Sequence, residues 1–378
     1  MATYKEQNKL NVPHLRFPEF HGEWEKCKLG YIATLTKGSG ISKDQRSATG
    51  TPCILYGELY TTYKSEVIDY VVSKTDISDK NLVRSCANDI IIPSSGETAI
   101  DISTARCVLS PDVLLGGDLN IIRLKDGDGR FFSYQLNGVR KHDIAKIAQG
   151  VSVVHLYGES LKGLTVSFPS NKEQQKISTL LSLIDERIAT QSKLIEKLES
   201  LIKGIAQKIV HSNKTNVRLS ECVECSSSTL QESDVCEHGA YPVYGANGIV
   251  GYLDNYNTEG EAVYIIKDGS GVGTVSYVTG KCSATGTLNT LQAKEGYSLQ
   301  YLYYLLKVFN FEPYKTGMAI PHIYFKDYGK AKFFCPSYTE QLQYAKSLSA
   351  IDSKLLVEKN ILTSLSMQKK YLLRQMFI

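Results

Sequence analysis

The chain has 378 residues, enough for two domains that each bury a core of their own. Hydrophobic residues make up 42% and charged residues 22%, and no apolar run approaches the roughly 18 residues of a membrane span. A net charge of +4 permits a polyanionic partner without requiring one, and the opening MATYKEQNKL lacks the apolar core of a secretory signal.

The first half is predicted to hold a globular domain over residues 15–168 and a long helix over 169–212. The domain opens with GEWEKCKLGYIATLTKGSG and continues with strand-like runs, glycine turns and aromatic residues. Ser170-x-x-Glu173, directly after Pro169, has the form of a helix capping box. Apolar residues then recur at steps of three, four and seven, the spacing of a coiled-coil seam: Leu181, Ile184, Ile188, Ile195, Leu198, Ile205 and Ile209.

The second half repeats this order, with a globular domain over 213–335 and a helix over 336–378. Ser337-x-x-Glu340 follows Pro336, and the corresponding seam is Leu348, Ile351, Leu355, Leu362, Leu365, Leu372 and Met376. A lone amphipathic helix of this length is not stable in water, so we expect the two helices to pair. The alternative is that each packs only on its own domain.

An internal repeat relates the two halves. Residues 149–210 align without a gap on 316–377, and thirteen of the 62 positions are identical. The globular regions match more loosely, 117–120 with 286–289 and 131–134 with 301–304. We therefore predict an α+β chain with two pseudo-symmetric globular domains and two long helices, a geometry suited to a target made of two separated parts.

The nine cysteines are expected to be reduced thiols, which indicates the cytoplasm. The spacing Cys222-x-x-Cys225 with Cys236-x-His238 is one that a zinc site could use. The repeat favours small buried cysteines instead, because it places Cys222 on Ile32 and Cys225 on Leu35.

The sequence lacks the motifs of several enzyme classes. There is no Pro-Pro, so the tetrapeptide of amino-methyltransferases is missing, and there is no G-x-x-x-x-G-K-[ST] phosphate loop. Gly269-Ser-Gly-Val-Gly273 leads into a predicted strand, where a dinucleotide fingerprint requires a helix. The one acidic-x-Lys triplet, Asp352-Ser-Lys354, lies on the seam of the second helix. We therefore expect no catalytic residue and no metal ligand.

Polar, glycine-rich turns occur in both halves, and their chemistry suits nucleic acid. Glycine lets backbone N–H groups approach phosphates, Ser, Thr and Lys fix position, and Asn or Tyr between them can read base edges. The 24 tyrosines also favour a binding surface, although buried strand tyrosine explains them equally well. The candidate DNA-binding residues from these turns are Lys37, Ser39, Lys43, Tyr56, Ser94, Ser95, Thr98, Tyr244, Asn247, Lys267, Ser270 and Lys281.

Several motifs together resemble the specificity subunits of type I restriction–modification systems. They are the opening run VPHLRFPEFHGEWEKCKLG, the repeat, Tyr241-Pro-Val-Tyr244-Gly-Ala-Asn-Gly248, and the Glu-Gln helix starts after FPS and CPS. Members often have Pro-Asn or Pro-His in the Gly-x-x-x segment. The second copy has Pro321-His322 but the first has Val154-His155, which adds His155 and His322 to the candidate residues.

The resemblance implies two target-recognition domains that each read half of a split double-stranded DNA site. It also implies that the helices form an antiparallel coiled coil setting the spacing. The subunit would be non-catalytic and bind no cofactor. It would assemble with two methyltransferase subunits that bind S-adenosylmethionine, and with motor-nuclease subunits that use ATP and Mg²⁺. The alternatives are a stand-alone methyltransferase or restriction enzyme with a fused recognition region, and a coiled-coil scaffold without a nucleic-acid role.

Overall fold

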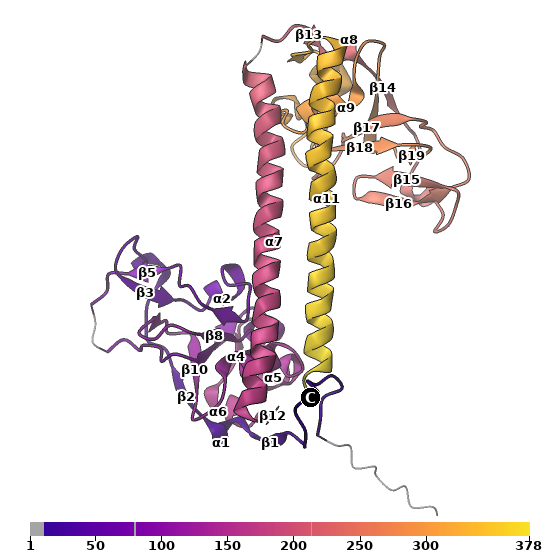
Figure 1. The fold of residues 1–378 in the computed structure, drawn as a ribbon. Coiled ribbons are helices and arrows are strands. Elements are labelled where there is room, and N and C mark those ends of the chain that lie inside the picture. The colour runs from indigo at the N-terminus through magenta and orange to yellow at the C-terminus, as the bar shows by residue number, and fades with distance from the viewer. Residues whose placement is uncertain (1–10, 79–80, 213) are drawn as a thin grey trace, which may run out of the picture. The chain divides into compact units, whose positions relative to one another are not determined.

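The computed structural model describes residues 11–78, 81–212 and 214–378. The chain forms two compact units, Met1–Thr190 with Leu362–Ile378 and Gln191–Ile361. Each unit contains one mixed domain, and both long helices, α7 (Asn171–Ser212) and α11 (Tyr338–Gln375), contribute to both units (Figure 1). The predicted α+β class with two domains and two long helices is thus confirmed. The opening MATYKEQNKL and residue 213, the predicted start of the second domain, lie outside the described residues.

The first domain is built on a five-stranded sheet in the order β2-β10-β6-β8-β4. Neighbouring strands are antiparallel except β4 and β8, which are parallel. Ile90 and Ile92 pack in one core with the helix α4, whereas Ile91 between them packs in the opposite core. A sheet covered on both faces explains why β6 is apolar without alternation. The strands are β2 (Ala33–Lys37), β10 (Leu119–Leu124), β6 (Asp89–Pro93), β8 (Arg106–Val108) and β4 (Val67–Ile68), and the helix is α4 (Gly129–Asn137).

The second domain repeats the centre of this arrangement. Its four-stranded antiparallel sheet has the order β14-β20-β17-β18, and the helix α9 packs on β17 and β18. In both domains the first and last strands pair, β1 with β12 and β13 with β21. The elements are β14 (Val223–Ser227), β20 (Leu288–Ala293), β17 (Glu261–Ile266), β18 (Val275–Thr279), α9 (Leu299–Leu306), β1 (Glu25–Lys28), β12 (Thr165–Phe168), β13 (Val217–Arg218) and β21 (Lys332–Phe333).

Shorter helices and strands lie along the chain between the main elements of both domains. In the first they are α1 (Leu29–Ile32), η1 (Lys43–Gln45), β3 (Thr51–Ile54), α2 (Glu58–Thr61), β5 (Lys74–Thr75), β7 (Ser95–Gly96), α3 (Ala99–Ile102), β9 (Leu114–Leu115), α5 (Lys141–Ile147), β11 (Val154–His155) and α6 (Gly158–Lys162). In the second they are α8 (Leu219–Cys222), η2 (Glu232–Asp234), β15 (Tyr241–Gly245), β16 (Gly248–Leu253), β19 (Ser283–Ala284), η3 (Glu312–Tyr314) and α10 (Phe325–Tyr328).

The two long helices begin where the capping motifs predict, but only one motif keeps its expected partner. At α11 the Glu340 carboxylate accepts hydrogen bonds from the backbone N–H and hydroxyl of Ser337, at 3.1 and 2.6 Å. At α7 the buried Glu173 carboxylate is instead bound by Arg16, whose Nε and Nη2 lie 2.7 and 2.8 Å from its two oxygens. Glu173 therefore fastens the N-terminal segment to the helix.

A glutamine shared by the repeat joins each long helix to its domain. Gln174 donates to the Pro169 carbonyl (2.8 Å) and accepts from the backbone N–H of Asp128 (2.9 Å), the residue that caps α4. Gln341 makes the same two bonds in the second unit, to the Pro336 carbonyl and from the N–H of Ser298, which caps α9. The two domains are thus attached to their helices by the same hydrogen bonds.

Within each unit, α7 and α11 pack against one another and confirm the antiparallel pair. In the first unit, Asp185 of α7 lies 2.5 Å from Lys369 of α11, and in the second, Glu199 of α7 lies 2.6 Å from Lys359. The predicted seam is right at most buried positions, but Ile202 and Ala206 are buried where Ile205 was expected. No helix within the described residues is long and apolar enough to span a membrane.

Candidate nucleic-acid interface

Each of the two central sheets has an edge from which several of the candidate turns emerge. In the first domain, β2 ends beside the start of β10, where Lys37 is opposite Asn120. In the second, Ser227 at the end of β14 is opposite Asn289 at the start of β20. Both asparagines hold the segment that follows: Asn120 donates to the Leu156 carbonyl and Asn289 to the Tyr328 hydroxyl, each at 2.8 Å. The match between 117–120 and 286–289 therefore marks an equivalent edge in each domain.

At this edge the first domain contains a hollow of about 750 Å³, lined in part by Lys43, Arg46, Tyr56 and Asp118. Lys37 and Lys43 are exposed, and Tyr56 stands edge-on to Tyr60 with ring centroids 6.5 Å apart. Ser39 is engaged in the fold, because its hydroxyl accepts from the backbone N–H of Val83 at 2.7 Å.

Arg46 is a cationic residue of this hollow that the sequence interpretation missed. Its guanidinium lies 3.7 Å from the buried Glu58 carboxylate and is 40% exposed, so part of its hydrogen-bonding capacity faces solvent. It was missed because the sequence interpretation looked for DNA contacts in or beside glycine turns, and Arg46 lies outside such a turn. An arginine can bind a guanine edge with two parallel hydrogen bonds.

A second group of candidates adjoins this hollow. The backbone N–H of Ser94 donates to the carbonyl of Asp118 at 2.8 Å, and Ser95 pairs with His155 between β7 and β11. Ser94 itself is buried. Thr98 caps α3 by accepting from the N–H of Asp101 at 3.1 Å. His155 is exposed, and its ring stacks on that of Tyr157 with the centroids 6.2 Å apart.

The second domain brings Lys267, Ser270 and His322 together at the end of β17. His322 Nδ1 lies 2.5 Å from the carboxylate of Asp268, and the Lys267 carbonyl accepts from the N–H of Ile323 at 2.9 Å. Ser270 is exposed on the turn that follows, whereas Lys267 is half-buried. The turn is therefore held by the His322 side chain and by the backbone N–H of Ile323.

The remaining candidates, Tyr244, Asn247 and Lys281, lie around the hairpin of β15 and β16. Asn247 is exposed at its tip, before Gly248 with a φ of 97°. The Tyr244 ring packs against the core residue Tyr264 at 5.6 Å, and burial raises the pKa of Tyr244. Lys281 is exposed, 4.7 Å above the Tyr256 ring. Packing against the core is thus a sufficient role for Tyr244, while Asn247 faces solvent.

The cysteines of the zinc alternative lie in different surroundings. Cys222 is buried with its sulfur 3.9 Å from that of Cys335, burial raises the pKa of Cys225 to about 11, and Cys236 is exposed. Among the residues that the structure describes, no group of three or more His, Cys, Asp or Glu is placed to hold a metal ion.

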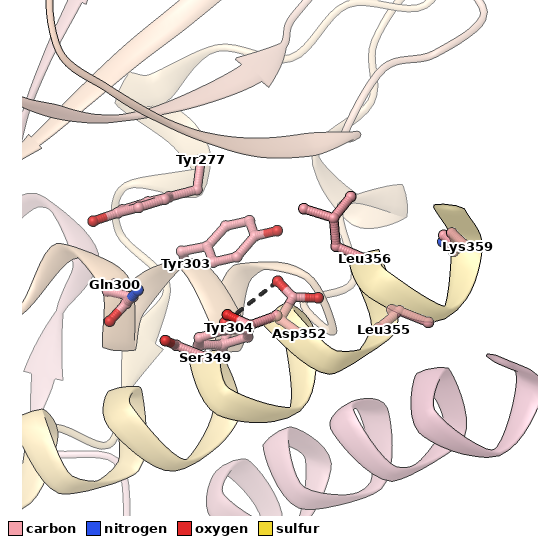
Figure 2. Close-up of a pocket in the computed structure, with 10 residues that line it drawn as sticks. Tyr277, Gln300, Tyr303, Tyr304, Ser349, Asp352, Leu355, Leu356 and Lys359 are labelled. Atoms are coloured by element: carbon pink, nitrogen blue, oxygen red, sulfur yellow. Dashed lines mark hydrogen bonds between the residues drawn. The ribbon is translucent and has the colours of Figure 1, made fainter. Parts of the chain in front are cut away.

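A cavity of about 340 Å³ lies between α9, β18 and α11 in the second unit. Figure 2 shows that Tyr303 and Tyr304 of α9 and Asp352 of α11 line it, and the Tyr304 hydroxyl donates to Asp352 at 3.3 Å. Burial, followed by the Asp352 charge, raises the pKa of Tyr304, so the phenol stays protonated at neutral pH. In the first unit Tyr134 donates in the same way to Asp185 at 2.8 Å. This repeated Tyr–Asp bond attaches each domain to its helix.

Comparison with known proteins agrees with this architecture. The family model described as type I restriction modification DNA specificity domain matches residues 21–200 and 211–367. A type I specificity subunit of Mycoplasma genitalium is 28% identical over 287 residues, 68% of this chain and 73% of that one. The specificity subunit of the type I restriction enzyme MjaVIII of Methanocaldococcus jannaschii is 24% identical over 265 residues, 63% and 58% of the two chains.

Solved structures show the same fold. The crystal structure of a type I restriction–modification S subunit from M. genitalium superposes with a TM-score of 0.71 at 22% identity, over 97% of this chain and 99% of that one. A chain from a structural study of complex assembly and conformational transition of the type I R-M system superposes with a TM-score of 0.52 at 15% identity. The match covers 93% of this chain and 96% of that one.

Proposed function

The chain belongs to the type I restriction–modification DNA specificity family, and from this premise we propose that it reads a double-stranded DNA target composed of two separated half-sites. The observation that most supports the proposal is the equivalent sheet edge in the two domains, at Asn120 and Asn289, from which different polar turns emerge. Because the two sheets present their turns in the same way but the turns differ in sequence, each domain is suited to a different half-site. Lysines near glycine turns would contact phosphates, and exposed side chains such as Asn247 and Arg46 would contact base edges.

The proposal extends to partners. Two similar halves offer two similar surfaces, so two methyltransferase subunits could dock in the same manner. These subunits would bring S-adenosylmethionine, and motor-nuclease subunits would bring ATP and Mg²⁺. The chain itself would bind no cofactor, catalyse no step and act in the cytoplasm.

Selection from a random DNA library tests this function. The chain, co-purified with a methyltransferase partner, should enrich two fixed sequence blocks separated by a constant, unspecified spacer. Arg46→Ala should weaken the first block and keep the second, while Asn247→Ala should weaken only the second. One continuous block, or no enrichment, contradicts a bipartite target.

The purified chain alone separates the alternatives. Incubated with S-adenosylmethionine and the selected DNA, it should transfer no methyl group. Reproducible transfer by chain that is free of partner subunits would instead support a stand-alone methyltransferase. Intact folding with no affinity for any DNA, alone or with the partner, would support the scaffold alternative.

A further inference from the structure

Two short loops, 149–155 and 316–322, have the same construction at corresponding positions of the repeat. Gln149 and His155 exchange both backbone hydrogen bonds, at 2.9 and 2.7 Å, and Thr316 and His322 do the same at 2.9 and 2.8 Å. In both loops the second residue is a glycine with positive φ, 125° at Gly150 and 88° at Gly317. A Cβ there would lie 2.1 and 2.3 Å from a carbonyl oxygen of the same loop, so each loop requires this glycine.

The tips of both loops are apolar and face solvent. Val151 is 96% exposed and Met318 is fully exposed, and Val153 and Ile320 are exposed at the second corresponding position. Single exposed apolar residues are ordinary on protein surfaces. Here, however, two apolar residues recur at the same positions of both loops, although their identities differ. The property that the two halves share is an uncharged, apolar tip on a closed loop.

The base of each loop is held by the candidate interface. β11 at the end of the first loop pairs with β7, so His155 lies opposite Ser95. In the second loop the Pro321 carbonyl accepts from the N–H of Gly269 at 3.0 Å, and His322 is bound to Asp268. The tips therefore project beside the turns proposed to contact DNA.

We propose that the two loops are wedges that insert between base pairs, one in each half of the DNA target. Val151 and Val153 would unstack a step in one half-site, and Met318 and Ile320 would unstack a step in the other. Apolar wedges on rigid supports are an established means of opening a base step. The occupant is DNA rather than a protein, because two side chains offer far less than the about 800 Å² per partner of a stable protein interface.

This inference rests on the proposed function and adds a task common to both half-sites. The loops have the same construction while the surrounding turns differ, so they act independently of the sequence that each domain reads. A methyltransferase must take its target base out of the stack before it can react. A step already opened by a wedge lowers the free energy that this extrusion requires.

Fluorescence of 2-aminopurine, placed at successive positions of the selected target, tests the wedges in the assembled complex with the methyltransferase partner. The native complex should increase the fluorescence at one step in each half-site. Val151→Ser with Val153→Ser should abolish the increase in one half-site only, and Met318→Ser with Ile320→Ser in the other only. Methylation of the affected half-site should slow about tenfold, because the partner must then supply the unstacking energy. The conservative pair Val151→Leu with Val153→Leu should retain both signals.

Val72→Ser is the matched control, because Val72 is an exposed valine of the first domain outside the loop. It should behave as the native chain does, and each double variant also serves as a control for the other half-site. Unchanged fluorescence and methylation in both double variants, with native target selection, would overturn the wedge and leave the proposed function intact. Loss of methyltransferase binding by the variants would also overturn it, since the loops would then dock a protein. Absence of target selection by the native complex would remove the proposed function itself.

Discussion

Lys369 lies between two carboxylates, and its replacement by methionine is expected to destabilise the first unit strongly. Its ammonium group contacts Glu66 and lies 2.5 Å from Asp185, and the side chains of Lys369, Glu66 and Asp185 are only 15%, 11% and 8% exposed. The Tyr134 hydroxyl also donates to Asp185, at 2.8 Å. Lys369→Met would leave two buried carboxylates close together without their contacting cation, and only the charge of the buried Arg106 would still act on both. Breaking a buried ion pair from one side typically costs about 3–5 kcal/mol.

The pH dependence of the variant follows from Glu66. Burial raises the pKa of Glu66 and the charge of Lys369 lowers it, so removal of the lysine should raise that pKa further. A carboxyl group whose pKa is higher in the folded state favours folding when protonated and opposes it when charged. The loss of stability should therefore be largest near neutral pH and should diminish as the pH falls through the raised pKa.

Thermal unfolding measures the effect, with hydrogen exchange of α4 peptides to assign it to the first unit. A loss of about 3–5 kcal/mol corresponds to a melting temperature roughly 6–20 °C lower. Lys307→Met is the matched control: Lys307 lies 3.9 Å from Asp352, the repeat counterpart of Asp185, and the two side chains are 33% and 30% exposed. That pair should contribute less than about 1 kcal/mol. Adding Glu66→Gln and Asp185→Asn to Lys369→Met should restore much of the stability. Native-like melting of Lys369→Met, or no recovery in the triple variant, would refute the reasoning.

Three further predictions concern DNA. Inserting four residues after Leu198, with four at the facing position of α11, adds about 6 Å, near two base pairs of rise, and should lengthen the selected spacer with both half-sites unchanged. Library selection checks this, and altered half-sites would show that the helices belong to the recognition surface. Alanine at a phosphate-contacting lysine should lower the log–log salt slope of binding by about 0.9 and weaken all sequences alike, in a salt titration of Lys37, Lys43, Lys267 and Lys281 variants. Asn247→Ala should cost about 1–3 kcal/mol on its half-site and little on random DNA. Tyr244→Ala should show the same loss of selectivity if the ring reads a base, whereas a lower melting temperature with unchanged selectivity removes it from the interface.

The long helices were predictable because their signals are local. A Ser-x-x-Glu start after proline and an apolar spacing of three, four and seven residues specify a helix and its buried face without knowledge of the rest of the chain. Ile202 was missed although it keeps the seven-residue spacing between Ile195 and Ile209, because the seam was assigned through Leu198 and Ile205, which are only half-buried. Ala206 is buried one turn after Ile202.

Contacts between distant segments could not be predicted in this way. Glu173 has the sequence of a capping residue but binds Arg16, 157 positions away, because a bidentate arginine outcompetes a neighbouring backbone N–H. Lys369 looks like an ordinary exposed helix lysine, and only the fold reveals the two carboxylates beside it. Likewise the sequence alone did not reveal that Tyr244 packs against Tyr264 or that Arg46 lines the hollow.

The identical positions of the repeat acquire a physical reason from the structure. Gln174 and Gln341 each tie a helix start to the cap of the domain helix, and Asp185 and Asp352 each accept a tyrosine hydroxyl from that helix. A buried polar group that loses its hydrogen-bond partner destabilises the fold. Both halves therefore keep these residues, even though their recognition turns differ. A domain attached by such bonds can exchange its turns without altering its attachment. Residues shared by the halves should therefore affect stability or both half-sites together, whereas residues that differ between them should alter one half-site alone.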